Sequence, residues 1–256
     1  MSAPKVSVIM PAFNREKYIA ESIESVLAQS FKDFELIVVD DGSTDKTVEI
    51  ARGIAASDQR VRIETNGKNL GIAKTRNRAL ELARAEYIAL LDSDDIWIDC
   101  NKLIKQTDFL DSHQDYALVG GAIRHIDPEG KALKVATFPE TDAGLRRVIL
   151  QINPFAQSTL MYRKGAILEA GGYSPEYQVC DDYALWLKVG KKYKFANFGD
   201  IFTGYRVHGG NITRTKRLTA AREIFEIVRD NSKAYPNARR GLLKAYIRLV
   251  VAFFRT

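Results

Sequence analysis

The amino-acid sequence predicts an α/β protein with a Rossmann-like, mostly parallel central sheet flanked by helices, followed by a basic α-helical C-terminal extension. The first half of the chain alternates short apolar runs with segments of helical periodicity, the pattern of buried parallel strands joined by helices. Acidic residues follow two of the apolar runs directly, where ligands of parallel sheets bind. Positive charge is concentrated after residue 213.

The first half is expected to contain four strands and three helices. One predicted helix places Ile19, Ile23, Val26 and Leu27 on a single face, which would pack on the sheet. A turn at Asp40-Asp41-Gly42, followed by Ser43, begins the second helix. The expected strands are Lys5–Met10, Phe34–Val39, Val61–Glu64 and Tyr87–Leu91, and the expected helices are Arg15–Gln29, Thr44–Ala56 and Ile72–Ala83.

The second half is more mixed and ends in two basic helices broken at Pro236. We place one boundary near residue 212, which gives a main domain, 1–212, and a basic amphipathic helical tail, 213–256. The expected helices before the boundary are Asn101–Ser112, Asp142–Gln151, Lys164–Ala170 and Asp182–Val189, and the expected strands are Tyr116–Arg124, Leu133–Phe138, Ser158–Tyr162, Tyr193–Phe198 and Ile201–Val207.

Composition is that of a globular protein, with 46% hydrophobic and 27% charged residues. We see no secretory signal and no apolar stretch of the roughly 18 residues needed to span a membrane. Cys100 and Cys180 lack metal-ligand spacing and read as free thiols of a reducing compartment, so a cytoplasmic location is expected. The net charge of +6 comes from the tail, whereas nucleic-acid-binding proteins spread such charge over the fold, so nucleic acid is not an expected partner.

Two acidic clusters follow predicted strands. Asp40 and Asp41 would bind a base edge, a ribose or a cation, or else one would cap the next helix. Asp92, Asp94 and Asp95 place three carboxylates in four residues, which suits a hard divalent cation shared with substrate phosphates. The alternative for this second cluster is an acidic helix N-terminus favoured by the helix dipole. Two acidic strand ends in one parallel sheet favour a site for a metal ion and a diphosphate.

Several segments, in order along the chain, resemble the motifs of the family 2 glycosyltransferases. The resemblance covers roughly residues 5 to 208 and implies the GT-A fold for residues 1–212. It also implies a metal-dependent, inverting transfer of a sugar from a nucleotide diphosphate-sugar to an acceptor hydroxyl. The segments are Val6–Asn14, Asp40–Asp45, Asn69–Arg78, Leu90–Asp95, Gly171–Glu176 and Asp181–Lys188.

The resemblance assigns roles on the donor side. The first strand-end loop would pack the nucleotide base, and Asp41, with Asp40 behind it, would accept a hydrogen bond from a pyrimidine, as in UDP or dTDP. Arg76 would lie near the nucleotide, where a guanidinium can neutralise the diphosphate. The expected nucleotide-sugar-binding residues are Pro11, Ala12, Asn14, Asp40, Asp41, Arg76, Asp92, Ser93 and Asp94.

Asp92 and Asp94 match the ends of the family's D-x-D motif. Asp92 would reach the ribose and Asp94 would hold Mn²⁺ or Mg²⁺, while Asp95 could take either role. His208 stands where some relatives place a residue near the metal or the diphosphate, although a lone histidine is more often structural.

Asp182 matches the family's catalytic base, which an acceptor hydroxyl needs because it is a weak nucleophile. Asp181 and Trp186 are expected on the acceptor side, Trp186 because it follows Asp182 by four residues. Ala184 departs from the family, which often has another Asp there, so acceptor contacts at that position are in doubt.

Other enzyme classes fit less well. Pro11-Ala12-Phe13-Asn14 has no glycine for a dinucleotide fingerprint, and the phosphate-binding loop of P-loop enzymes is absent. A sugar-1-phosphate nucleotidyltransferase ranks second, although it would carry a Gly- and Arg-rich first loop. A catalytically inactive nucleotide-sugar-binding relative ranks third, since it would be expected to lose Asp94 or Asp182.

The tail leaves two interpretations open. The stretch 239–255 mixes large apolar residues with spaced cations and would either lie on an anionic membrane, at the inner face of the cell membrane, or pack on the protein or in a homodimer. Membrane binding would suit a lipid-linked rather than a free saccharide acceptor, as in surface polysaccharide or glycolipid synthesis.

Overall fold

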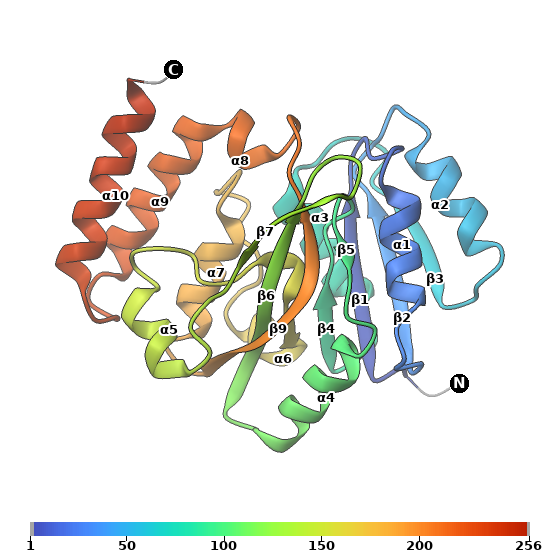
Figure 1. Cartoon of the computed structure of the whole chain (residues 1–256), viewed down its shortest axis with the longest axis horizontal. Coiled ribbons are helices and arrows are strands. Elements are labelled where there is room, and N and C mark those ends of the chain that lie inside the picture. Colours follow the sequence, from blue (N-terminus) through green and yellow to red (C-terminus); the bar gives the residue numbers. More distant parts are fainter. Residues whose placement is uncertain (1–2, 255–256) are drawn as a thin grey trace.

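A computed structural model describes residues 3–254, apart from the side chains of residues 213 and 214. Helices flank a central sheet on both sides (Figure 1). The strands are β1 (Val6–Ala12), β2 (Phe34–Asp40), β3 (Val61–Thr65), β4 (Tyr87–Leu90), β5 (Ile96–Trp97), β6 (Tyr116–Ile126), β7 (Ala132–Ala136), β8 (Met161–Arg163) and β9 (Lys194–Arg206). The helices are α1 (Ile19–Leu27), α2 (Thr47–Ala55), α3 (Ile72–Leu82), α4 (Lys102–Ser112), α5 (Asp142–Val148), α6 (Lys164–Glu169), α7 (Asp181–Val189), α8 (Ile212–Thr215), α9 (Arg217–Asn231) and α10 (Ala238–Phe253).

The sheet is parallel in its first half and mixed in its second. Its strand order is β3-β2-β1-β4-β8-β6-β9-β5, with β7 paired to β6. The strands β3, β2, β1 and β4 run parallel, β8 runs antiparallel to both neighbours, and β6 pairs in parallel with β9. The α/β fold class expected from the sequence is therefore confirmed.

Alternate residues of each buried strand pack into two separate hydrophobic cores, one on each face of the sheet. Val8 and Met10 of β1 pack with α1, α2 and α4 on one face of the sheet. Ile9, between them, packs with α3, α5, α6 and α7 on the other face, because successive strand side chains point to opposite sides. The nearly continuous apolar runs of the sequence thus correspond to strands covered on both faces.

The last helices share the second of these cores. Ala220, Ile227 and Val228 of α9 and Ala245 of α10 are buried in the same cluster as Leu187 of α7. Figure 1 shows α9 and α10 side by side at the edge of the molecule. The division into 1–212 and 213–256 stays a prediction, and the Arg255 end of the expected 239–255 stretch lies outside the described residues. No described helix is long and apolar enough to cross a membrane.

A few elements differ from those expected. The expected strand Ser158–Tyr162 begins as a 3₁₀ turn, Gln157–Thr159, because the Thr159 hydroxyl bonds the carbonyl of Ala156 and competes with the sheet ladder. The two expected strands between residues 193 and 207 are one strand, β9, whose register against β6 shifts near Gly120. The tail holds three helices rather than two, since α8 precedes α9.

Candidate active site

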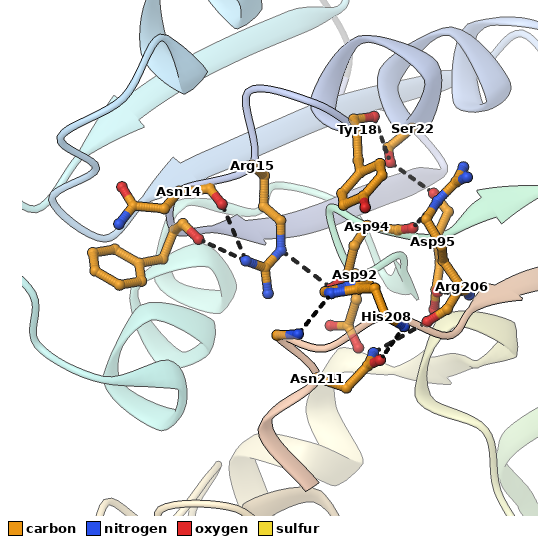
Figure 2. A network of polar contacts seen from close by, with 12 residues as sticks. Asn14, Arg15, Tyr18, Ser22, Asp92, Asp94, Asp95, Arg206, His208 and Asn211 are labelled. Atoms are coloured by element: carbon orange, nitrogen blue, oxygen red, sulfur yellow. Dashed lines mark hydrogen bonds and ion pairs between the residues drawn. The ribbon is translucent and has the colours of Figure 1, made fainter. Parts of the chain in front are cut away.

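The predicted site residues gather at the carboxyl ends of the parallel strands. The segment after β4 carries Asp92, Asp94 and Asp95, the loop after β1 carries Arg15, and the loop after β9 carries His208. Figure 2 shows Arg15 and His208 pointing toward Asp94, whereas Asp95 lies on the side of Arg206.

Asp95 shapes the loop after β4. Its carboxylate accepts hydrogen bonds from the backbone N–H of Arg206, at 2.8 Å, and from the Ser158 hydroxyl, at 2.5 Å. The same hydroxyl oxygen accepts the backbone N–H of Asp92 at 3.1 Å. Burial and the charges of Asp94 and Asp92 raise the pKa of Asp95 well above its usual value. Both Asp95 oxygens therefore accept hydrogen bonds from the protein. This position differs from the metal-facing one expected from the sequence.

Arg206 completes the support for this loop. Its guanidinium is almost fully buried, and Nε donates to the carbonyl of Asp94 at 2.9 Å. Its other nitrogens bind Glu21 of α1 and the carbonyls of Asp127 and Pro128. The backbone of the acidic segment is thus fixed from β9 and from α1.

Asp94 receives two cationic or polar groups on one oxygen. Arg15 Nε lies 3.1 Å and His208 Nε2 3.0 Å from Asp94 Oδ2. Burial opposes ionisation, but the hydrogen bond from His208 and the charge of Arg15 outweigh it and lower the pKa of Asp94. Asp94 is consequently an ionised carboxylate at neutral pH, as a ligand of a divalent cation must be.

The ring of His208 is oriented from its own loop. The backbone N–H of Gly210 donates to Nδ1 at 3.1 Å, so a neutral ring carries its proton on Nε2 and donates it to Asp94. A metal-binding histidine instead donates its second ring N–H outward. In this arrangement His208 positions Asp94, and the carboxylates are the groups that fit a metal.

The acids after β2 point into the protein to different extents. Asp41 accepts three hydrogen bonds, from the Asn66 amide and from the backbone N–H groups of Leu70 and Gly71. Asp40 Oδ2 accepts two backbone N–H groups of the following turn, whereas Asp40 Oδ1 is buried and has no hydrogen-bond partner among the described residues. The free acceptor is therefore on Asp40, while Asp41 shapes the loop before α3.

The first strand-end loop lies against the turn after β2. Asn14, in a left-handed conformation, binds Thr44 N–H through its side chain and the Ser43 hydroxyl through its backbone. Pro11 and Ala12 are buried at the end of β1, and Ser93 is buried in the turn after β4. Packing of the nucleotide base on Pro11, Ala12 and Asn14, as expected from the resemblance, stays a prediction.

Arg76 of α3 joins the two halves of the site. Its NH2 group lies 3.1 Å from Asp92 Oδ1, and its NH1 group lies 3.1 and 3.0 Å from the two oxygens of Asp181. Its guanidinium also lies over the ring of Tyr173. The charge of Arg76 is thus already compensated by two carboxylates, and one guanidinium spans from the β4 loop to α7.

Asp182 stands in the first turn of α7 beside this ion pair. Its oxygens accept the Asn153 amide at 3.2 Å and the backbone N–H of Tyr183, and the residue as a whole is half-buried. Burial and the adjacent charge of Asp181 raise the pKa of Asp182 to about 7. A carboxylate with this pKa can accept a proton near neutral pH.

Two residues expected on the acceptor side lie elsewhere. Asp181 is buried in the pair with Arg76. Trp186 is fully buried against the rings of Tyr162 and Tyr173, because the helical period places it on the apolar face of α7. Their positions differ from the acceptor-facing ones expected from the resemblance for Asp181 and from the spacing to Asp182 for Trp186.

Sequence reasoning missed Arg15, Ser158 and Arg206. Arg15 had a readable signal, since it is a cation directly after the first strand-end loop. Ser158 and Arg206 contact the acidic segment from 63 and 111 residues away, and no local pattern marks such residues.

A family model described as glycosyl transferase family 2 matches residues 7–170, more than half of the chain. Over 252 residues the chain is 31% identical to an Escherichia coli protein named UDP-Glc:alpha-D-GlcNAc-diphosphoundecaprenol beta-1,3-glucosyltransferase WfaP, covering 97% of this chain and 91% of that one.

Solved structures share the fold. S. aureus TarS 1-349, in complex with UDP-GlcNAc, superposes with a TM-score of 0.72 at 24% identity and covers 98% of this chain and 72% of its own. The mannosyltransferase PcManGT from Pyrobaculum calidifontis, in complex with GDP-Man and Mn²⁺, superposes with a TM-score of 0.71 at 18% identity, covering 100% of this chain and 76% of its own.

Proposed function

The chain belongs to the family 2 glycosyltransferases, enzymes that use nucleotide-sugar donors, and from this premise we propose an inverting, metal-dependent transfer from a UDP- or dTDP-sugar to an acceptor hydroxyl. Asp182 takes the proton from that hydroxyl as it attacks the anomeric carbon. The nucleoside diphosphate leaves from the opposite face, so a single displacement inverts the anomeric centre. Membership of the family leaves the nucleotidyltransferase alternative without support.

The position of Arg76 carries this proposal. One guanidinium contacts both Asp92, at the donor side, and Asp181, directly before the proposed base. This contact supports placing the donor-side Asp92 and the proposed base Asp182 in one site, because Asp182 directly follows Asp181. An inactive relative would be expected to lose Asp94 or Asp182, and both are present.

The carboxylates of Asp94 and Asp92 fit a hard divalent cation such as Mn²⁺ or Mg²⁺. Within residues 3–254 no three His, Cys, Asp or Glu side chains could hold a metal by themselves. Such cations commonly take one or two protein carboxylates and complete their shell with phosphate oxygens and water. When bound, the cation would supply positive charge against the departing diphosphate.

The base-reading role fits Asp40 best. Its Oδ1 has no partner among the described residues and would accept the imide N–H of uracil or thymine once the side chain turns toward the base, whereas Asp41 is occupied by backbone groups. An acceptor oxygen buried without a partner is costly, and a base that donates to this oxygen would remove that cost.

We also propose a lipid-linked acceptor used in surface polysaccharide or glycolipid synthesis, with the enzyme peripheral at the inner face of the cell membrane. The likeness to WfaP, whose name gives a diphosphoundecaprenol acceptor, supports this class. The charge of the tail supports the location.

A panel of nucleotide-sugars, tested for release of the nucleoside diphosphate with Mn²⁺ and with EDTA, tests the donor and the metal together. We expect release from a UDP- or dTDP-sugar only with the metal. NMR of the product linkage then tests the displacement, and retention of configuration contradicts it.

A further inference from the structure

The outer face of α10 is an apolar stripe that is largely exposed, although the ring of Tyr246 contacts Phe225 of α9. Leu243, Tyr246, Ile247 and Val251 are between 42% and 61% exposed, and Phe254, just past the helix, is 81% exposed. These positions recur at helical spacing opposite the buried Gly241 and Ala245. An apolar stripe of this size on a terminal helix marks an interaction surface.

Cations border this stripe, and no acid lies near it along the helix. Arg239, Arg240 and Lys244 are exposed, and the sequence contains no Asp or Glu after Asp230. Arg222 of α9 adds a further cation at a groove of about 300 Å³ between the two helices. That groove is otherwise lined by Leu218, Leu249, Val250, Phe253 and Phe254.

We propose that this surface, the outer face of α10 together with the groove beside α9, binds an anionic phospholipid bilayer. Apolar side chains enter the acyl boundary while the flanking cations meet lipid phosphates. A symmetric homodimer through the same face would bring the cations of both copies into one interface with no acid of α10 to pair with them, and would lose energy to like-charge repulsion.

The orientation suits the proposed lipid-linked acceptor, on which this inference builds. In Figure 1 the C-terminal end of α10 and the loop that follows β9, which carries His208, both lie at the top of the molecule. The C-terminal end of the lipid surface therefore lies at the same end of the molecule as the active site in this view.

Sedimentation with vesicles tests the surface without depending on activity. The full chain is expected to pellet with phosphatidylglycerol vesicles, less with phosphatidylcholine vesicles, and less in high salt. Removing two cations by Arg240→Gln with Lys244→Gln is expected to lower partitioning about 30-fold, at roughly 1 kcal/mol per charge.

Leu243→Asp with Ile247→Asp is expected to abolish binding, whereas the matched pair Leu133→Asp with Val135→Asp, on exposed positions of β7, is expected to leave it unchanged. The proposal is overturned if both double variants lose vesicle binding equally, or if the full chain does not bind the vesicles. A change in sedimentation coefficient of the α10 variant without lipid would show that a second copy covers the face instead.

Glu223 of α9 binds the segment that leads into α7. Its carboxylate is buried and accepts the backbone N–H groups of Gln178, Val179 and Cys180 at 2.7, 3.0 and 2.9 Å. These three residues come directly before Asp181 and Asp182. Hydrogen bonds to an ionised acceptor are among the stronger ones in proteins.

We infer that Glu223 is a positioning residue for the proposed base Asp182, so that the C-terminal helices take part in catalysis through the start of α7. The inference rests on the proposed role of Asp182. Loosening this segment would let water reach Asp182, which is faced by Asp181, Arg76 and Asp92. The donor side would be little affected, because its carboxylates lie after β2 and β4.

Glu223→Gln tests this inference, with the exposed Glu226→Gln on the same helix as the matched control. We expect kcat to fall roughly 10- to 100-fold with the donor KM unchanged, and the midpoint of the pH profile to move below that of the wild type. An unchanged kcat, or a fall in kcat with an unmoved midpoint, overturns the inference. Full activity of Asp182→Asn in parallel would instead show that the base assignment itself is wrong.

Discussion

The pH dependence of turnover follows directly from the environment of Asp182. A base works only when ionised, and a pKa of about 7 makes the ionised fraction rise from about one tenth at pH 6 to about nine tenths at pH 8. An ordinary aspartate, with a pKa of 3.8, would be fully ionised throughout that range. We therefore expect kcat to increase about tenfold between pH 6 and pH 8, and to be lost as the pH falls through 7.

Asp182→Asn keeps the shape of the side chain and removes its basicity. We expect kcat to fall roughly 10²- to 10⁴-fold, with donor affinity little changed and the rise between pH 6 and 8 gone. The assay is steady-state release of the nucleoside diphosphate in the presence of acceptor, with Asp108→Asn, an exposed position on α4, as the control. A variant with comparable turnover, or a wild type with a flat profile, refutes the assignment.

The same shift affects stability with a defined sign. Because the folded state holds the Asp182 proton more tightly than the unfolded state, this group lowers the free energy of unfolding as the pH rises from about 4 to about 7. Urea denaturation of Asp182→Asn should lack that contribution. At pH 8 the variant is therefore expected to have a larger free energy of unfolding than the wild type from this contribution. Below pH 4 the difference should disappear.

Three further substitutions probe the rest of the site and the core. Asp94→Asn is expected to abolish metal-dependent binding of UDP with the fold intact, and calorimetry showing the same affinity with and without EDTA would contradict the metal assignment. Ser158→Ala leaves the Asp92 N–H and an Asp95 oxygen without their partner, so urea denaturation should show a loss of about 1–3 kcal/mol, against little change for the exposed Ser57→Ala. Lys102 is fully buried, burial lowers its pKa well below 10.5, and its Nζ donates to Gln106. Wild-type stability should therefore rise as the pH approaches 10.5, a rise that Lys102→Met removes.

The sequence was most informative where chemistry is local. Nearly continuous apolar runs identified β1 to β4, because strands covered on both faces need such runs. The acids after β2 and β4 were found because each follows its strand directly. What the pattern could not provide is the direction of each carboxylate. Asp95 and Asp181 look equivalent to their neighbours in sequence, yet long-range contacts with Arg206 and Arg76 turn both inward.

Asp41 has a consequence for the entropy of binding at the proposed nucleotide site. Its bonds to Asn66, Leu70 and Gly71 hold the loop before α3 in place without any ligand. The conformational entropy of that loop is therefore lost during folding, and little of it remains to oppose the nucleotide. Gly42 shows how closely the loop is held, since a Cβ there would lie 2.7 Å from a backbone carbon of Lys68. A larger residue at Gly42 would push the loop away and weaken nucleotide affinity while leaving every proposed ligand contact chemically intact.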